Sequence, residues 1–160
     1  MNPQPDARIR SLAIILVAMI LGMLAFGCVS LAIKGGGTWT PNQSFDSILL
    51  LQILVGMIIV ETPVVWLVRK IQTKQLRSRL ESLSQDERNA LLSNGFFAAV
   101  LIPAALLEGF GLFGVMIHQI TGCLLGLIAP AIAAIGIAFL LPSRDKYERF
   151  AERMHERDVL

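Results

Sequence analysis

The chain has 160 residues, of which 54% are apolar and 16% are charged, and its formal net charge is +2. Soluble domains carry about 25% charged residues, so this composition excludes an ordinary soluble protein. The length suits a single domain, 1–160. Four long stretches contain no acidic or basic residue other than histidine: residues 11–33, 47–60, 93–107 and 109–143.

The uncharged stretches predict membrane-spanning helices. A helix rises about 1.5 Å per residue, so about 20 apolar residues cross a hydrocarbon core of about 30 Å. Because the stretches are continuously apolar, they predict helices and not the alternating strands of a β-barrel. We therefore expect an all-α membrane protein, a bundle of four transmembrane helices over residues 11–33, 48–68, 96–117 and 120–141.

The last two predicted helices belong to one apolar run. As a single helix this run would be about 69 Å long, which is more than twice the thickness of the hydrocarbon core. The chain must therefore reverse direction within it. The polar residues His118, Gln119 and Thr121, together with Gly122, mark the place where we expect the turn.

The first uncharged stretch, residues 11–33, has two interpretations besides a retained transmembrane anchor. Its basic flank suits a cleavable signal peptide, but its uncharged length exceeds the usual apolar core of about 7–15 residues, so we expect a retained anchor. Cys28 follows Ala25-Phe26-Gly27, which leaves a lipoprotein cleavage site as the other interpretation. Cys28 and Cys123 are expected at similar depth on the outer side, where a disulfide between them is an open question.

Basic residues predict the orientation. Of the 14 Lys and Arg residues, all but Lys34 lie before the first predicted span, between the second and third, or after the fourth. Basic residues next to spans stay in the cytoplasm. The pattern predicts a multi-pass protein of the cytoplasmic (inner) membrane with both termini in the cytoplasm. Residues 34–46 and 118–121 are expected outside.

The segment between the second and third spans, residues 69–95, is expected to be a cytoplasmic loop with helical parts. Ser84 and Glu87 have the spacing of a capping box, which predicts a helix beginning at Gln85. The pair Asn94-Gly95 is expected to end this helix or to kink it into the third span.

Residues 143–158 predict an amphipathic C-terminal helix. Tyr147, Phe150, Ala151 and Met154 share one face, and most of the other residues are charged. Two interpretations remain open. The helix lies on the inner membrane surface, with its basic residues near anionic lipid, or it docks a partner protein.

Small residues recur at helical spacing in the fourth span, and in lipid such residues allow helices to approach closely. They are Gly122, Gly126, Ala129, Ala133 and Gly136. We predict that they form a helix-packing seam against the third span, where Ala105 and Gly109 give a matching notch. Ala18 and Gly22 give a similar notch in the first span.

Glu61 and Glu108 are the acidic residues inside the predicted spans. Carboxyl groups at that depth are costly, and no Lys or Arg lies there to pair with them, so we expect both to be protonated near neutral pH. They are candidate proton or ion sites. The alternative is a buried hydrogen bond from each carboxyl to a backbone carbonyl that Pro63 or Pro103 leaves unpaired.

Residues 108–115 read Glu-Gly-Phe-Gly-Leu-Phe-Gly-Val. This stretch resembles the carboxylate helix of the proteolipid, or c, subunits of rotary ATPases, in which Glu is followed by three residues, an aliphatic residue, Tyr or Phe, Gly and another aliphatic residue. The resemblance implies that Glu108 is a reversible proton or sodium site in an oligomeric ring. It covers only this stretch, and the second span lacks the glycine-repeat partner helix of that family.

The sequence contains no HExxH, GxSxG, P-loop or paired-Cys motif, so we predict no catalytic residue, metal or cofactor. The leading prediction is a small non-enzymatic membrane protein that acts through helix–helix contacts, as an oligomer or an accessory subunit. The alternative is a proton- or ion-coupled translocation subunit that uses Glu108. Expected partners are the lipid bilayer and a second copy or another membrane protein, and not nucleic acid.

Overall fold

The computed structural model describes residues 5–38, 45–80 and 84–155, and within these ranges the regular elements are all helices. The elements are α1 (Pro5–Lys34), α2 (Phe45–Leu80), α3 (Gln85–Thr121), the short 3-10 helix η1 (Leu124–Leu127), α4 (Ile128–Leu140) and α5 (Arg144–His155). The prediction of an all-α fold is confirmed.

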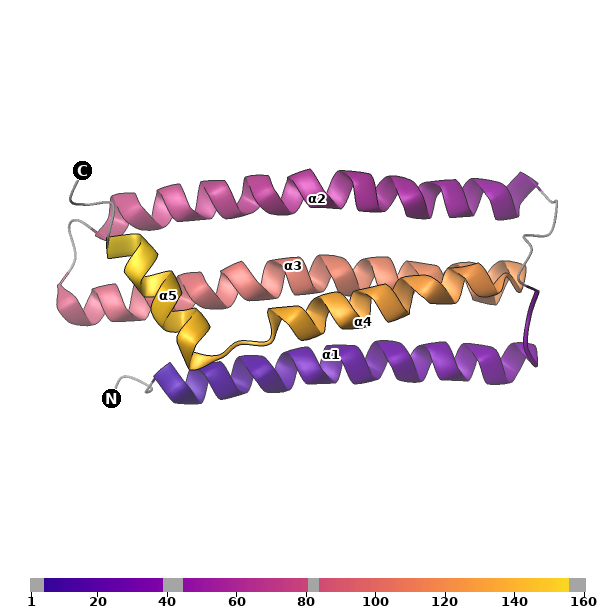
Figure 1. Ribbon diagram of the computed structural model, residues 1–160, viewed down its shortest axis with the longest axis horizontal. Coiled ribbons are helices and arrows are strands. Elements are labelled where there is room, and N and C mark those ends of the chain that lie inside the picture. The colour runs from indigo at the N-terminus through magenta and orange to yellow at the C-terminus, as the bar shows by residue number, and fades with distance from the viewer. Residues whose placement is uncertain (1–4, 39–44, 81–83, 156–160) are drawn as a thin grey trace.

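Three helices, α1, α2 and α3, are each long and apolar enough to cross a membrane. A fourth candidate span is the bent pair formed by Leu124–Leu140 and Arg144–Met154, whose axes meet at 68°. Figure 1 shows α1 to α4 running along the long axis of the molecule, with α5 crossing them at one end.

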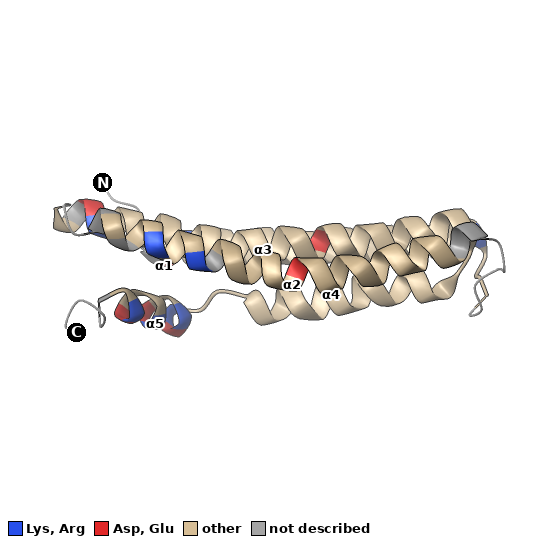
Figure 2. Cartoon of the chain, turned by 90° about the horizontal axis from the view of Figure 1, so that it is seen from above, with Lys and Arg blue, Asp and Glu red and all other residues tan. Residues whose placement is uncertain are grey.

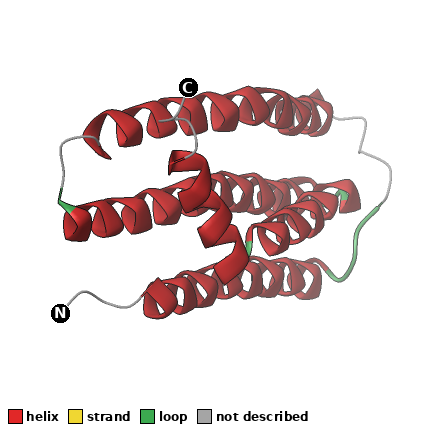
Figure 3. Cartoon of the chain, turned by 60° about the vertical axis from the view of Figure 1, so that its left-hand side comes forward, coloured by secondary structure: helices red, strands yellow, loops and turns green. Residues whose placement is uncertain are grey.

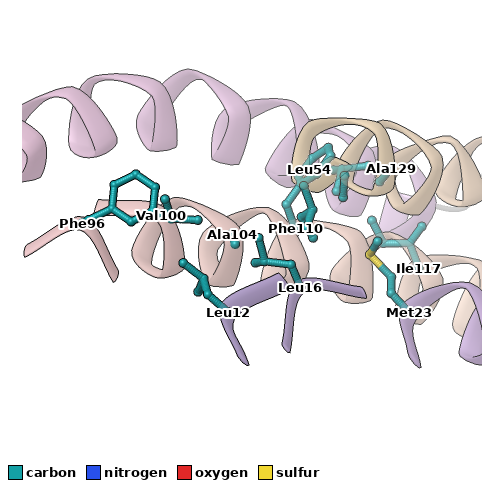
Figure 4. Close-up of a cluster of buried hydrophobic side chains, with 12 residues drawn as sticks. Leu12, Leu16, Met23, Leu54, Phe96, Val100, Ala104, Phe110, Ile117 and Ala129 are labelled. Atoms are coloured by element: carbon teal, nitrogen blue, oxygen red, sulfur yellow. The ribbon is translucent and has the colours of Figure 1, made fainter. Parts of the chain in front are cut away.

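The central element is α3, which packs against α1, α2 and α4. α1 and α4 also contact each other, so that α1, α3 and α4 form a closed trio, whereas α2 packs mainly against α3. The largest side chains of the trio's core are fully buried, as Leu12, Leu16, Met23 and Ile117 illustrate (Figure 4).

Small residues hold α3 and α4 together. A Cβ atom on Gly114 would collide with the Ala129 methyl group and the Gly126 carbonyl oxygen. A Cβ atom on Gly111 would collide with the Met23 sulfur of α1. Side chains are missing at these positions, so the backbones of α3 and α4 approach closely.

The helix-packing seam seen in the structure differs from the predicted seam at Gly122 and at the two predicted notches. Ala133 is fully buried and Gly136 faces Leu107, in agreement with a seam on α4. Gly122, however, lies outside it, because it caps the C-terminus of α3 in the left-handed conformation, with φ 71°. Its N–H donates to the His118 carbonyl at 2.8 Å, as in a common helix stop.

The two predicted notches, on α3 and on α1, do not pack against another helix of the same chain. Gly109 and Gly22 have no atom of another element within 4 Å of an added Cβ, and Ala105 and Ala18 are exposed. α3 uses Gly111 and Gly114 instead, which lie on a different face because successive residues turn by about 100°.

The helix boundaries differ from those predicted as well. α3 continues to Thr121 and α4 begins only at Ile128, so the predicted helix over 120–141 is divided by the turn at Gly122 and by η1. The segment 69–95 was expected to be a loop with helical parts, and in the described residues all of it except Ser84 is helical, with residues 81–83 outside the description. The predicted start at Gln85 is confirmed, because α3 begins there and the Ser84 N–H donates to the Glu87 carboxylate at 3.0 Å in the predicted capping box.

Gly95 neither ends nor interrupts α3. A Cβ atom there would lie 2.6 Å from a methyl carbon of Leu76, so this glycine allows α2 to approach α3. The neighbouring Asn94 accepts a hydrogen bond from Arg8 at 2.6 Å, which ties the start of α1 to the same part of α3.

At the other end of the bundle, residues 35–38 form a strap over the α3–α4 turn. The Thr38 N–H donates to the Gly122 carbonyl at 3.1 Å, and the Leu124 N–H donates to the Thr38 carbonyl at 2.9 Å. Cys123, beneath the strap, is buried and Cys28 is exposed, and both are free thiols.

The amphipathic face of α5 packs within the chain. The Phe96 ring of α3 meets Tyr147 and Phe150 edge to face, with ring centroids 5.4 and 5.6 Å apart. Met154 is buried against Leu92. Figure 3 shows α5 crossing the end of the bundle, so α3 covers the face that was expected to meet lipid or a partner. Residues 156–158 of the predicted helix lie outside the described residues.

Candidate functional site between α2, α3 and α4

Glu61 lines a groove formed by α2, α3 and α4. The groove has a volume of about 330 Å³ and is partly open to the surroundings. Its polar side chains are Glu61 and Thr62. Its apolar wall includes Ile58 and Val65 of α2, Leu106 and Phe110 of α3, and Ile132 and Leu140 of α4.

The groove exists because α2 packs on α3 and leaves the nearby face of α4 uncovered. Ile132 of α4 is 49% exposed, and Ile58 of α2 is 44% exposed. Gly136 contributes no side chain, and its Cα faces Leu107 of α3. The open space between α2 and α4 therefore follows from the way the helices are arranged, with α3 as the shared floor.

Glu61 is half-buried and has no hydrogen-bond or ion-pair partner in the part of the chain that the structure describes. The adjacent Thr62 hydroxyl donates to the Ile58 carbonyl at 2.9 Å and so is directed along its own helix. The next basic residue of α2 is Arg69, whose Cα lies about 12 Å further along the helix axis. The ammonium group of Lys70 lies over the Trp66 ring.

Glu108 lies on another side of α3. Met23 and Gly27 of α1 lie against Gly111 and Val115 of α3, and the same register places Glu108 at the level of Ile20. Successive residues of a helix turn by about 100°, so the α3 residues that line the groove lie on average about 150° around the helix axis from Glu108. The structure therefore does not bring the two predicted carboxyls into one site.

The alternative role for the two carboxyls was a hydrogen bond to a backbone carbonyl that a proline leaves unpaired, and the described geometry gives it no support. Pro63 and Pro103 leave the carbonyls of Ile59 and Ala99 without their helical partners. Over residues 45–80 and 84–155, neither Glu61 nor Glu108 makes a hydrogen bond to a backbone carbonyl. Figure 2 shows an isolated red band on α2 and another on α3, away from the charged end of the bundle.

His118 is a buried polar residue whose environment the sequence did not reveal. It is fully buried beneath the strap, with Nδ1 3.3 Å from the Cys123 carbonyl oxygen. Its Nε2 has no partner among the described residues. Gly37 allows this burial, because a Cβ there would lie 3.1 Å from the imidazole ring and would collide with the Gly122 carbonyl.

Within the described residues, His, Cys, Asp and Glu form no cluster of three or more that could hold a metal ion. A comparison of the chain with protein-family models, with curated proteins and with solved structures finds no match. The resemblance of residues 108–115 to the proteolipid subunits thus stays a prediction, and the site must be judged on its own geometry.

Proposed function

We propose that the protein is a four-span protein of the cytoplasmic membrane with both termini in the cytoplasm. The three membrane-length helices and the bent pair are compatible with this topology. The basic residues support the orientation, because in the described ranges all of them but Lys34 lie toward the end of the bundle at which α1 begins, α2 ends and α5 lies. Figure 2 shows most of the charged residues toward this end.

A reporter-fusion experiment tests the topology. Fusions after Leu83 and Leu160 are expected to give a cytoplasmic signal, and a fusion at Pro41 is expected to give an external signal. A cytoplasmic signal from the Pro41 fusion would contradict the proposed orientation.

The proposed activity is non-enzymatic and depends on helix–helix contacts with a second copy or with another membrane protein. The observation that carries it is the pair of small-residue notches that the fold leaves unused, Ala18 with Gly22 on α1 and Ala105 with Gly109 on α3. In lipid, helices associate where small residues let their backbones approach. The contacts inside the chain use other glycines, so these notches remain free for contacts between chains.

The oligomeric state of the purified protein tests this proposal. We expect an oligomer in detergent and in lipid nanodiscs, and we expect Gly22→Leu or Gly109→Leu to shift it toward the monomer. Neither leucine meets an atom of a neighbouring element within 4 Å of its Cβ, so the fold should persist. Ile14→Leu and Leu112→Ile, at exposed positions of the same helices, are matched controls.

A wild-type protein that is monomeric in both environments would contradict self-association. Co-purification with a single membrane protein, lost in Gly22→Leu or Gly109→Leu and kept in the controls, would then support the accessory-subunit form. If both glycine variants keep every association of the wild type, the notches are not contact sites.

The second candidate function is proton or ion handling by Glu108. It is favoured by a carboxyl that faces α1 with no cation and no hydrogen-bond partner in the described ranges. Labelling with a hydrophobic carbodiimide, which reacts with protonated carboxyls, tests it. Labelling that is strong at low pH, fades as the pH rises and disappears in Glu108→Gln is expected for this function. Absence of labelling at every pH in a folded sample would exclude it.

A further inference from the structure

We propose that the groove between α2, α3 and α4 binds a lipophilic cation, that is, an apolar molecule with one positive charge, and that the Glu61 carboxylate is its counter-ion. The site goes beyond the proposed helix contacts, because its α3 residues centre about 130° around the helix from the notch at Ala105 and Gly109. Only one part of this proposal depends on the proposed membrane location, namely the route by which the ligand reaches the groove.

The charge of the ligand follows from the unpaired carboxyl. An acidic group in apolar surroundings is costly unless a cation or a set of donors compensates it. The described part of the chain supplies neither, since the Thr62 hydroxyl is bonded to Ile58 and Lys70 lies over Trp66. A ligand that carries the positive charge completes the site, because it compensates the carboxylate that forms when Glu61, expected to be protonated in the empty groove, releases its proton to solvent.

The apolar body of the ligand follows from the wall of the groove. Apart from Glu61 and Thr62, the lining side chains are aliphatic or aromatic, with Phe110 buried at the floor. The volume of about 330 Å³ falls in the range of small-molecule sites, about 300–1,000 Å³, which combine apolar walls with few polar groups. Among the lining side chains, a strongly hydrated cation such as Na⁺ finds only the Glu61 carboxyl and the Thr62 hydroxyl as oxygen ligands.

At the groove, Ile58 of α2 is 44% exposed and Ile132 of α4 is 49% exposed, so we infer that the groove opens beside these two helices. In the proposed topology this opening faces lipid, and Glu61 lies about 10 Å from Val68, the inner end of the predicted second span. A lipophilic cation dissolved in the membrane reaches the carboxylate sideways, without passing through the closed trio of α1, α3 and α4.

Binding of tetraphenylphosphonium to the full-length protein in nanodiscs tests the proposal. We expect saturable binding that Glu61→Gln weakens by at least about tenfold, because the desolvated charge loses its counter-ion. The matched control is Glu108→Gln, which removes a carboxyl from α3 outside the groove, and which should bind like the wild type. Ile132→Phe, which narrows the groove without touching the charge, should also weaken binding.

Tetraphenylsilane, a neutral molecule of the same shape, separates charge from shape. It should bind at least about tenfold more weakly than the phosphonium to the wild type, and equally to the wild type and to Glu61→Gln. Equal binding of the two probes would overturn the proposal, as would phosphonium binding that survives Glu61→Gln or is lost equally in Glu108→Gln.

Failure of this proposal is distinguishable from failure of the proposed function. The oligomeric state depends on Gly22 and Gly109, which do not line the groove. Glu61→Gln is expected to leave the oligomeric state unchanged, and the glycine variants are expected to leave phosphonium binding unchanged.

Discussion

Helices α1, α3 and α4 pack closely against one another, whereas α2 packs on this trio along one side only. In the most apolar window of α3, 44% of the residues are buried, whereas only 6% are buried in that of α2. The trio achieves its burial through glycine and alanine, which let backbones touch. α2 presents mostly large aliphatic residues and meets α3 along one side, so it leaves space beside α4.

The difference suggests a division of roles. Gly111 is the point at which the trio closes, because the Met23 sulfur of α1 and the Ala133 methyl group and Pro130 of α4 all lie next to it. In the described residues, α2 makes no comparably close contact with α4. The trio therefore supplies the stable scaffold, and α2 supplies the variable wall of the groove with its unpaired carboxyl.

The largest expected effect comes from filling the seam of the trio. Gly126→Leu would place a side chain against the Gly114 carbonyl and the His118 amide, which forces α3 and α4 apart. We expect a loss of about 1–3 kcal/mol or more, measured as a lower melting temperature in detergent. Gly56→Leu is the matched control, because a Cβ atom there has nothing within 4 Å and the residue belongs to neither notch, and its melting temperature should be unchanged.

If Gly126→Leu melts like the wild type while Leu127→Ala does not, α4 uses a different face and the account of the trio is wrong.

The difference in cost between two core substitutions should be smaller than the effect of filling the seam, and it separates the two regions directly. Leu16 of α1 is fully buried in the trio, and Leu54 is the α2 side chain most buried in the core. Leu16→Ala should cost about 2–5 kcal/mol, and Leu54→Ala should fall at or below the lower end of that range, since lipid can fill a cavity at the edge. Chemical or thermal unfolding in detergent measures both. A larger loss for Leu54→Ala would reverse the ranking of the two regions.

The smallest effect concerns the strap at the end of the trio. Gly37→Ala would press a methyl group against the Gly122 carbonyl and the His118 ring, so residues 35–38 should detach from the turn at little global cost. In a Cys28→Ser background, we expect Cys123, which is fully buried in the wild type, to react faster with a water-soluble maleimide. Gly22→Ala is the control, and an unchanged labelling rate in Gly37→Ala would show that the strap does not protect the thiol.

Much of the helical pattern was accessible from the sequence, because long uncharged apolar stretches leave few alternatives to helices. The turn near Gly122 was accessible for the same reason, since a single helix would have been too long. The start of α3 at Gln85 was accessible from the capping box of Ser84 and Glu87. What the apolar stretches did not predict is how far the helices extend, because the charged parts of α2 and α3 continue the helices beyond those stretches.

The contacts between helices were harder to predict. α3 carries small residues on two faces, and only the register of α4 selects Gly111 and Gly114 over Ala105 and Gly109. The face of α5 has the same pattern whether it meets lipid or Phe96. The groove joins residues of three helices, so no local pattern marks it, although Glu61 itself was identified as a candidate by its isolation from basic residues.

Cysteine cross-linking across the two interfaces of α4 tests the central contrast most directly. In a background without Cys28 and Cys123, the pair Leu107→Cys and Gly136→Cys lies at the α3–α4 seam, where a Leu107 methyl carbon is 2.9 Å from the position of a Cβ on Gly136. The pair Ile58→Cys and Ile132→Cys lies on opposite walls of the groove. We expect a rapid direct disulfide for the seam pair, and for the groove pair no direct disulfide but efficient linkage by a longer bis-maleimide. Direct disulfides that form at the same rate in both pairs would mean that α2 closes onto α4, and would contradict the division into a closed trio and an open wall.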